Sequence, residues 1–331
     1  MENLEIAGIS VAPGTRRRHE IDLVELADGT KVRIPLDIIH GGEPGPRLYL
    51  GAAIHGDEVD GVAILFRALA GIDPAKLRGS VVCVPVQHPL SFHADHRLPI
   101  SQFMKSPLDQ APADAWTCFP GDSDGNLAQI LAATLFDMIK VCDWAVDIHT
   151  PTRGGRYVPI AILPHPNLGD LHTRAEEMAH AFGSGWIMRT DTGFYVADGI
   201  LCVEATRAGV PSFTFETGEG GRLEEDVVDG GAGNIRNVMK WLKMIDGDPT
   251  LPAQTYVMRE FLGLRAHRGG LLLNRKKLGE LVKAGDTLCS IVDIYGDEVE
   301  TIVAPEDGVF VRTTTLSTVS RGERAATLGL L

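Results

Sequence analysis

A histidine and a glutamate three positions apart, His55 and Glu58, have the clearest chemical potential in this sequence. A second histidine, His149, directly follows the apolar residues 144–148. Two imidazoles and one carboxylate are a ligand set that zinc accepts in enzymes, where a further position stays open for water. The three residues therefore predict a zinc site, and the open position indicates hydrolysis.

Predicted secondary structure would bring these ligands together. Residues 48–54 form a short apolar run typical of a buried strand, and residues 59–69 have apolar side chains at helical spacing. The first two ligands thus lie where a strand leads into a helix, and the third follows the strand predicted at 144–148. Ligands of open α/β sheets bind at the carboxyl ends of strands, so all three are expected at one edge.

An acidic residue follows another predicted strand. Residues 211–215 predict a strand, and Glu216 comes directly after it. Asp147, two positions before His149, could orient that imidazole from behind. Both acids strengthen the prediction of a metal site at this edge of the sheet.

Three other histidines compete for this role. His88, His93 and His96 lie close together at the start of residues 88–126, a long irregular stretch that indicates a functional loop. No predicted strand or helix fixes their geometry, and a ligand set needs rigid support. We interpret them as pocket-lining or solvated residues.

The order of these motifs resembles the succinylglutamate desuccinylase/aspartoacylase family, a branch of the zinc carboxypeptidase clan. The resemblance covers most of residues 47–320 and rests on His55-Gly-Asp-Glu58, Asp147-Ile-His149-Thr and Glu216-Thr-Gly-Glu-Gly-Gly. It implies that His55, Glu58 and His149 hold one zinc ion. It also implies that Glu216 is the general base, which takes a proton from the zinc-bound water and delivers it to the leaving amine.

The segment between these motifs follows the family pattern only in part. Arg97 matches the arginine that, by resemblance, stabilises the developing oxyanion. Phe119-Pro-Gly is present, but Asp114-Ala-Trp-Thr-Cys replaces the Asp-Leu-Asn-Arg run that precedes it in relatives. In those relatives the Asn-Arg pair grips a substrate carboxylate. Lys105, Arg153 or Arg156 could replace that pair, and Arg156 and Lys105 are our candidates for substrate binding.

Alternating strands and helices after residue 47 predict an α/β fold, a mixed sheet flanked by helices like that of the zinc carboxypeptidases. Helical patterns occur at 127–141, 168–182 and 232–245. Residues 1–45 predict antiparallel strands joined to this sheet, which gives a catalytic domain over 1–250.

Beyond a linker at 246–252, short strands between turns predict a smaller all-β domain at 255–331. It resembles the barrel-sandwich half-barrel of lipoyl carrier domains. A carrier would present a lysine at its hairpin tip, whereas this chain has Tyr295-Gly-Asp there. We therefore expect a structural role for this domain.

Composition narrows the choice of partners. The chain of 331 residues has a formal net charge of −13, which argues against binding to nucleic acid. No apolar run approaches the length of a membrane span, and no secretion signal is visible at the N-terminus. The five cysteines are scattered singly, which is typical of reduced thiols in the cytoplasm. The expected partner is a small N-acylated molecule, and a homo-oligomer remains open.

Taken together, the residues predict a zinc-dependent amidohydrolase that deacylates a small N-acyl amino acid or related amide. One alternative keeps the site but changes the bond, as in a metallo-carboxypeptidase or an esterase. The other is a metal-binding protein without catalytic activity.

Overall fold

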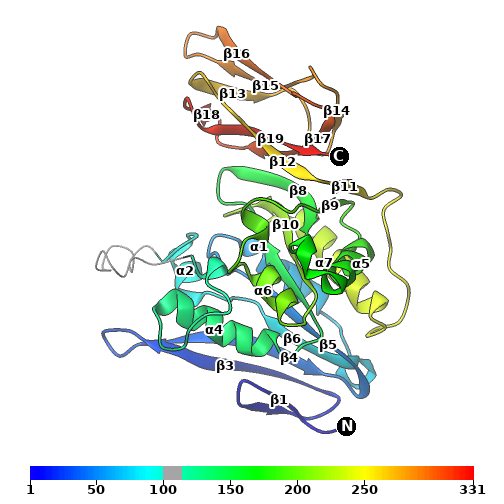
Figure 1. Cartoon of the computed structure of the whole chain (residues 1–331). Coiled ribbons are helices and arrows are strands. Elements are labelled where there is room, and N and C mark those ends of the chain that lie inside the picture. Colours follow the sequence, from blue (N-terminus) through cyan, green and yellow to red (C-terminus); the bar gives the residue numbers. More distant parts are fainter. Residues whose placement is uncertain (100–113) are drawn as a thin grey trace.

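The computed structural model describes residues 1–99 and 114–331. A larger α/β part and a smaller β part, formed by the C-terminal strands, lie one above the other (Figure 1). The predicted fold class, a mixed sheet flanked by helices with a β-rich C-terminal region, is confirmed.

The central sheet has 13 strands, and its parallel middle carries the candidate ligands. In spatial order the middle strands are β10 (Ser212–Glu219), β7 (Trp144–His149), β5 (Glu43–Ala52) and β6 (Arg78–Val84). Antiparallel neighbours flank them, namely β8 (Gly155–Ile162) on one side and β4 (Lys31–His40) and β3 (Thr15–Glu25) on the other. Every residue of β7 and β10 is buried, as expected for parallel strands covered on both faces.

Helices cover both faces of this sheet. One face packs against α1 (Val59–Ala68), α5 (Asp170–Phe182) and α7 (Glu225–Trp241). The other packs against α4 (Leu127–Ile139) and α6 (Leu201–Arg207). The small hairpin of β1 (Leu4–Ile6) and β2 (Ile9–Val11) also contributes to this second core, so the predicted antiparallel strands at the N-terminus are confirmed.

Short elements connect these strands and helices. They are η1 (Pro74–Lys76), α2 (Pro89–Ala94), η3 (Ala115–Thr117), η4 (Pro166–Leu168), β9 (Trp186–Met188) and η5 (Phe194–Val196). The stretch 88–126, predicted to be irregular throughout, therefore contains short helical turns.

Two helix predictions need correction. The helix predicted at 232–245 begins earlier, at Glu225, and ends at Trp241. Its glycines weaken helical propensity, but Gly231 lets α7 approach α1, because a Cβ there would lie 2.5 Å from Ile64 Cδ1. The sequence also missed α6, which is short and buried along most of its length.

The C-terminal strands form two layers around a separate core. The strands are β11 (Tyr256–Met258), β12 (Glu260–Arg265), β13 (Gly270–Asn274), β14 (Leu281–Val282), β15 (Thr287–Val292), β16 (Glu298–Val303), β17 (Gly308–Thr314), β18 (Thr318–Val319) and β19 (Arg324–Leu330). One layer, β16-β15-β13-β18, is a sheet of its own, whereas β12, β19 and β17 extend the central sheet through the pairing of β17 with β8. The C-terminal strands thus reach the sheet that carries the candidate ligands.

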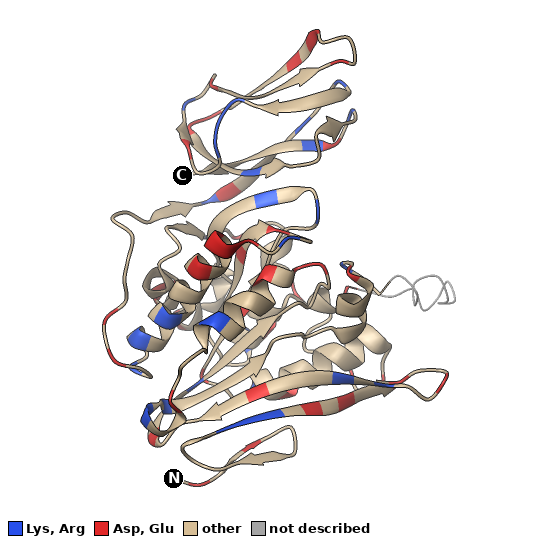
Figure 2. Ribbon diagram, turned by 180° about the vertical axis from the view of Figure 1, so that it is seen from behind, with Lys and Arg blue, Asp and Glu red and all other residues tan. Residues whose placement is uncertain are grey.

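Charges of both signs are interspersed over the two parts of the molecule (Figure 2). Among the described helices, none is both long and apolar enough to cross a membrane.

Candidate metal centre and active site

The turn between β5 and α1 places His55 and Glu58 in the interior. Both side chains are almost completely buried. The backbone N–H of Glu58 donates to the carbonyl of His55 at 3.2 Å, which closes the turn. Gly56 is required here, because a Cβ at this position would lie 1.8 Å from the Ser91 carbonyl oxygen. The close approach of α2 therefore holds the turn in place.

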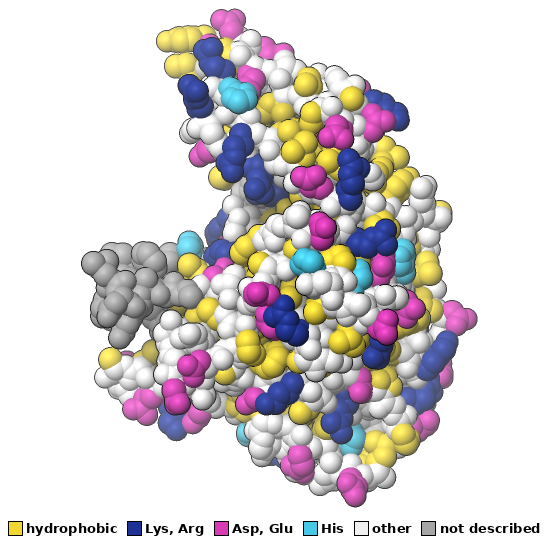
Figure 3. Space-filling view, in the orientation of Figure 1, with side chains coloured by type: hydrophobic (Ala, Val, Ile, Leu, Met, Phe, Trp, Pro, Cys, Tyr) yellow, Lys and Arg dark blue, Asp and Glu magenta, His cyan; other side chains and the backbone are white. Residues whose placement is uncertain are grey.

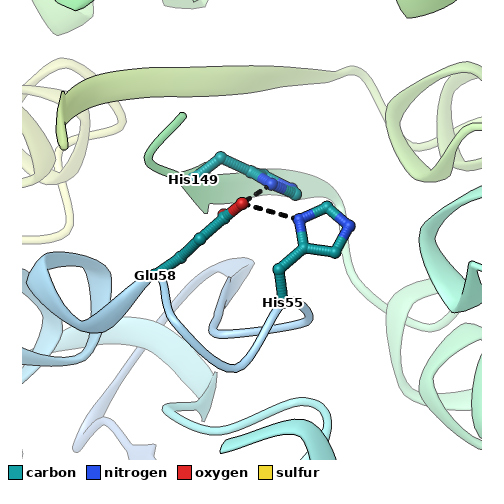
Figure 4. A group of neighbouring side chains, drawn as sticks. All are labelled: His55, Glu58 and His149. Carbon is teal, nitrogen blue, oxygen red and sulfur yellow. Dashed lines mark hydrogen bonds and ion pairs between the residues drawn. The ribbon is translucent and has the colours of Figure 1, made fainter. Parts of the chain in front are cut away.

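The carboxylate of Glu58 lies between the two imidazoles (Figure 4). Its Oε1 is 2.7 Å from His55 Nδ1, and its Oε2 is 2.9 Å from His149 Nδ1. One donor atom from each residue lies within 4.8 Å of the others. His149 ends β7, so separate strand ends supply the two histidines.

Hydrogen bonds behind the histidines fix their orientation. His149 Nε2 is 2.7 Å from Asp147 Oδ2, which also accepts a hydrogen bond from Trp116 Nε1 at 2.9 Å. His55 Nε2 is 3.1 Å from Asp114 Oδ1. A carboxylate on Nε2 leaves the lone pair of Nδ1 available toward the cluster, as metal-bound histidines require. The donor set and its supporting acids therefore fit a zinc ion.

The charges around Glu58 favour a cation at this position. Burial opposes ionisation of this carboxyl, but the adjacent His55 and His149 outweigh it and lower the pKa of Glu58 to about 2. Burial likewise disfavours the charged form of His149, yet Asp147 and Glu58 raise its pKa well above the usual range. A divalent cation at the three donors would take the place of the protons on these histidines.

Glu216 lies next to this cluster. It is on β10, directly opposite His149 of β7 in the parallel register. Its Oε1 accepts a hydrogen bond from the Tyr195 hydroxyl at 2.8 Å, whereas its buried Oε2 has no hydrogen-bond partner within the described part of the chain. Burial raises the pKa of Glu216 to about 7. One oxygen is thus free to exchange a proton near neutral pH.

Arg97 also lies beside the cluster. Its Nη2 is 2.8 Å from Asp114 Oδ2, and its Nη1 is 3.8 Å from Glu58 Oε1. Asp114 therefore contacts both His55 and Arg97 and couples the positions of the two side chains.

These groups line a cavity of about 160 Å³. Its described lining includes His55, His149, Glu216, Arg97, Trp116, Tyr157, Phe194, Tyr195, Arg312 and Arg324. A larger hollow of about 450 Å³ shares Tyr157, Phe194, Tyr195 and Arg324 with it. The inner cavity has room for a small molecule, and the outer hollow adjoins it.

The structure brings five of the predicted site residues together, namely His55, Glu58, His149, Glu216 and Arg97. Arg156 is elsewhere. Because side chains alternate along a strand, the placement of Tyr157 in the cavity turns Arg156 to the opposite face, where it pairs with Glu224. Lys105 lies outside the described residues. The substrate-binding roles of Arg156 and Lys105 stay predictions.

The competing basic residues are also accounted for. Arg153 pairs with Asp95 at the surface. His88 is buried and accepts a hydrogen bond from the Ser91 backbone N–H at 3.4 Å, whereas His93 and His96 are exposed. None of these histidines belongs to the described cluster of donors.

Sequence reasoning missed several residues of the site. Asp114 could have been found, since it lies five positions before Phe119 and matches the first residue of Asp-Leu-Asn-Arg. Trp116 then stands where relatives carry asparagine, and it packs edge-on against His55 with ring centres 5.8 Å apart. Arg312 and Arg324 carry no local signal, because they are ordinary polar residues on strands of the C-terminal region.

This mixed α/β sheet, with a buried polar cluster at its strand ends, is found here in a chain from a deacylase family. The chain belongs to the succinylglutamate desuccinylase/aspartoacylase family, whose catalytic-domain model matches residues 44–242. That match covers more than half of the 331 residues and confirms the resemblance that the motifs indicated.

Individual relatives resemble this chain over nearly its whole length. The N-alpha-acetyl-L-2,4-diaminobutyric acid deacetylase of Halomonas elongata is 24% identical over 305 residues, which cover 90% of this chain and 85% of the relative. A succinylglutamate desuccinylase/aspartoacylase structure from Rhodobacter sphaeroides has a TM-score of 0.80 at 26% identity and covers 99% of both chains. The product-bound ectoine utilization protein EutE (DoeB) of Ruegeria pomeroyi has a TM-score of 0.79 at 22% identity, covering 96% of this chain and 95% of that one.

Proposed function

We propose that this chain is a zinc-dependent amidohydrolase that removes the acyl group from a small N-acyl amino acid or related amide. One observation carries the proposal, namely the buried cluster of His55, Glu58 and His149 beside Glu216, whose second oxygen is free. Membership of a deacylase family supports the same reaction class.

In this proposal His55, Glu58 and His149 hold the zinc ion. A bound zinc ion would polarise the scissile carbonyl and lower the pKa of a water to about 7. Glu216 takes a proton from the attacking water on its free oxygen and passes it to the departing nitrogen. Tyr195 holds the other oxygen of Glu216 and so orients the base.

Arg97 supplies positive charge beside the cluster. Its guanidinium stabilises the negative charge that develops on the carbonyl oxygen as the nucleophile adds. Asp114 binds Arg97 through two nitrogens, Nε at 3.1 Å and Nη2 at 2.8 Å, and so fixes the direction of the guanidinium.

The size of the cavity supports a small substrate. A volume of about 160 Å³ suits an acylated amino acid better than a peptide chain, which disfavours a carboxypeptidase. The Halomonas relative is named as a deacetylase of N-alpha-acetyl-L-2,4-diaminobutyric acid. That compound is therefore the first substrate to test, with short peptides and esters as comparison substrates.

Substitution of Glu216 tests the proposed mechanism. The Glu216→Gln variant should bind zinc like the wild type while its turnover of the N-acetyl substrate falls at least about 100-fold, the usual size of a general-base effect. Glu219→Gln is a matched control, because Glu219 is a buried acid on the same strand that binds Thr315 and Arg222. Normal turnover by Glu216→Gln would show that the role assigned to Glu216 is wrong.

A further inference from the structure

Two arginines from the C-terminal strands face the active-site cavity. Arg312 is on β17 and Arg324 is on β19, and both line the cavity together with Glu216 and His149. Neither forms an ion pair within the described residues. On the face shown in Figure 3, the surface is hollowed where the C-terminal strands meet the larger part, and Lys and Arg side chains gather there. The cavity therefore has cationic groups that its own acids do not neutralise.

The position of Arg312 is set by the pairing of two strands. Arg312 lies opposite Tyr157 in the antiparallel register of β17 and β8, and its guanidinium carbon is 5.9 Å from the centre of that ring. Gly155 leaves the room for it, because a Cβ there would lie 2.3 Å from Arg312 Nη2. Burial and the nearby Glu216 raise the pKa of Tyr157, whereas Arg312 and Arg324 act on it in the opposite direction. Both arginines line the same cavity as Tyr157.

Arg312 Nη1 is buried and has no hydrogen-bond acceptor among the described residues. A buried donor without an acceptor is unfavourable and calls for a ligand. The neighbouring acids already have partners, since Asp114 binds Arg97, Asp147 binds His149 and Glu58 joins the two histidines. Glu216 lines the cavity with one free oxygen, but it forms no ion pair with Arg312 within the described residues. The missing partner of Arg312 is thus an anionic group that enters with the substrate.

Where relatives carry the Asn-Arg pair, this chain cannot grip a carboxylate. Trp116 donates its ring N–H to Asp147, and the hydroxyl of Thr117 donates to the carbonyl of Asp114 at 2.8 Å. We propose that Arg312, with Arg324 beside it, binds a carboxylate of the substrate and so determines specificity from the C-terminal strands. A guanidinium suits this task because it can form two parallel hydrogen bonds with a carboxylate.

This inference rests on the proposed function, and a selectivity measurement tests it. Arg312→Met should lower kcat/KM for N-acetyl-L-2,4-diaminobutyrate about 10- to 100-fold, mainly through KM, and change kcat/KM for the corresponding carboxamide less than about threefold. Gly155→Ala should act in the same direction by displacing the guanidinium. Arg321→Met, an exposed arginine of the same region, should behave like the wild type.

The substrate carboxylate could belong to the amine half or to the acyl half, and two substrates distinguish these sources. N-acetyl-L-2,4-diaminobutyrate carries it on the amine half, whereas N-succinyl-propylamine carries it on the acyl half. The substrate whose kcat/KM falls in Arg312→Met identifies the half that Arg312 binds. Equal losses for the carboxamide and for both acids would indicate a structural role and overturn the inference.

A binding measurement separates this inference from the reaction itself. Titration calorimetry of the zinc-loaded protein with L-2,4-diaminobutyrate and its carboxamide needs no turnover. The wild type should bind the acid at least about tenfold more tightly, and Arg312→Met should abolish that preference. If no amide is hydrolysed but this preference is found and lost in the variant, the proposed function fails and the inference holds. A wild type that prefers neither L-2,4-diaminobutyrate over its carboxamide nor succinate over succinamate, which represent the acyl half, overturns the inference.

Discussion

At the scale of single residues, Asp147 orients His149, a proposed metal ligand. It is fully buried, and its Oδ2 binds both His149 Nε2 and the ring N–H of Trp116. The carboxylate therefore fixes the ring plane of the histidine and the nitrogen that it presents to Glu58. Residues in this position usually account for a substantial part of metal affinity.

Asp147→Asn is expected to weaken zinc binding about 10- to 100-fold, because an amide can no longer accept the Nε2 proton with full charge. Competition with a fluorescent zinc chelator measures the dissociation constant. Asp137→Asn, an exposed acid on α4, is the control and should leave the constant unchanged. If Asp147→Asn bound zinc as tightly as the wild type, Asp147 would have no role in metal binding.

At the scale of secondary-structure elements, the first turn of α1 contains a buried acid, Asp60, whose ionised form is unfavourable in the folded protein. Asp60 is fully buried, its Oδ1 accepts the Glu224 backbone N–H at 2.9 Å, and its Oδ2 has no partner in the part of the chain that the structure describes. Burial raises the pKa of Asp60 to about 6. The site therefore favours the protonated carboxyl, so the fold loses stability as the pH rises from the unfolded pKa, near 3.8, to the folded pKa, near 6.

Asp60→Asn should raise the free energy of unfolding above pH 6, by about 1–2 kcal/mol after allowance for screening and for the lost interaction with the helix dipole. The difference builds up between the unfolded pKa, near 3.8, and the folded pKa, near 6, so it should be clearly smaller at pH 4.5 than at pH 7.5. Urea denaturation of the metal-free variant and wild type at pH 4.5 and 7.5 measures this. A difference that does not grow with pH would contradict the assignment.

The arrangement of the strands also explains which site residues could be predicted from the sequence. His55, His149 and Glu216 are polar residues at the ends of apolar runs, and the parallel order of those strands brings them together. Arg312 follows Val-Phe-Val on an ordinary alternating strand, and its place in the cavity depends on the register between β17 and β8, which local patterns do not contain. Alternation along β8 then turns Arg156, the neighbour of Tyr157, away from the cavity.

At the scale of the whole molecule, β17 joins the C-terminal core to the catalytic part. Phe310 faces the C-terminal core, whereas Val309 and Val311 pack in a cluster with Tyr157 and Ile160 of β8. Two domains over 1–250 and 255–331 remain our proposal, but the shared sheet indicates that they unfold together.

Tryptophan fluorescence can test this coupling, because all four tryptophans (Trp116, Trp144, Trp186 and Trp241) precede the C-terminal strands. Phe310→Ala removes a fully buried ring from the C-terminal core and should cost about 3–5 kcal/mol. If the two parts unfold as one unit, the variant lowers the denaturant midpoint seen by tryptophan fluorescence. An unchanged midpoint, with circular dichroism showing a separate earlier transition, would indicate independent domains.

The account as a whole depends on one divalent ion bound by His55, Glu58 and His149. Anomalous diffraction recorded on both sides of the zinc edge, from crystals of protein with measured metal content, tests this most directly. We predict one zinc per chain and a single anomalous peak in contact with these three side chains. Zinc-supplemented protein without a peak there, or with its zinc held by other residues, would contradict the account.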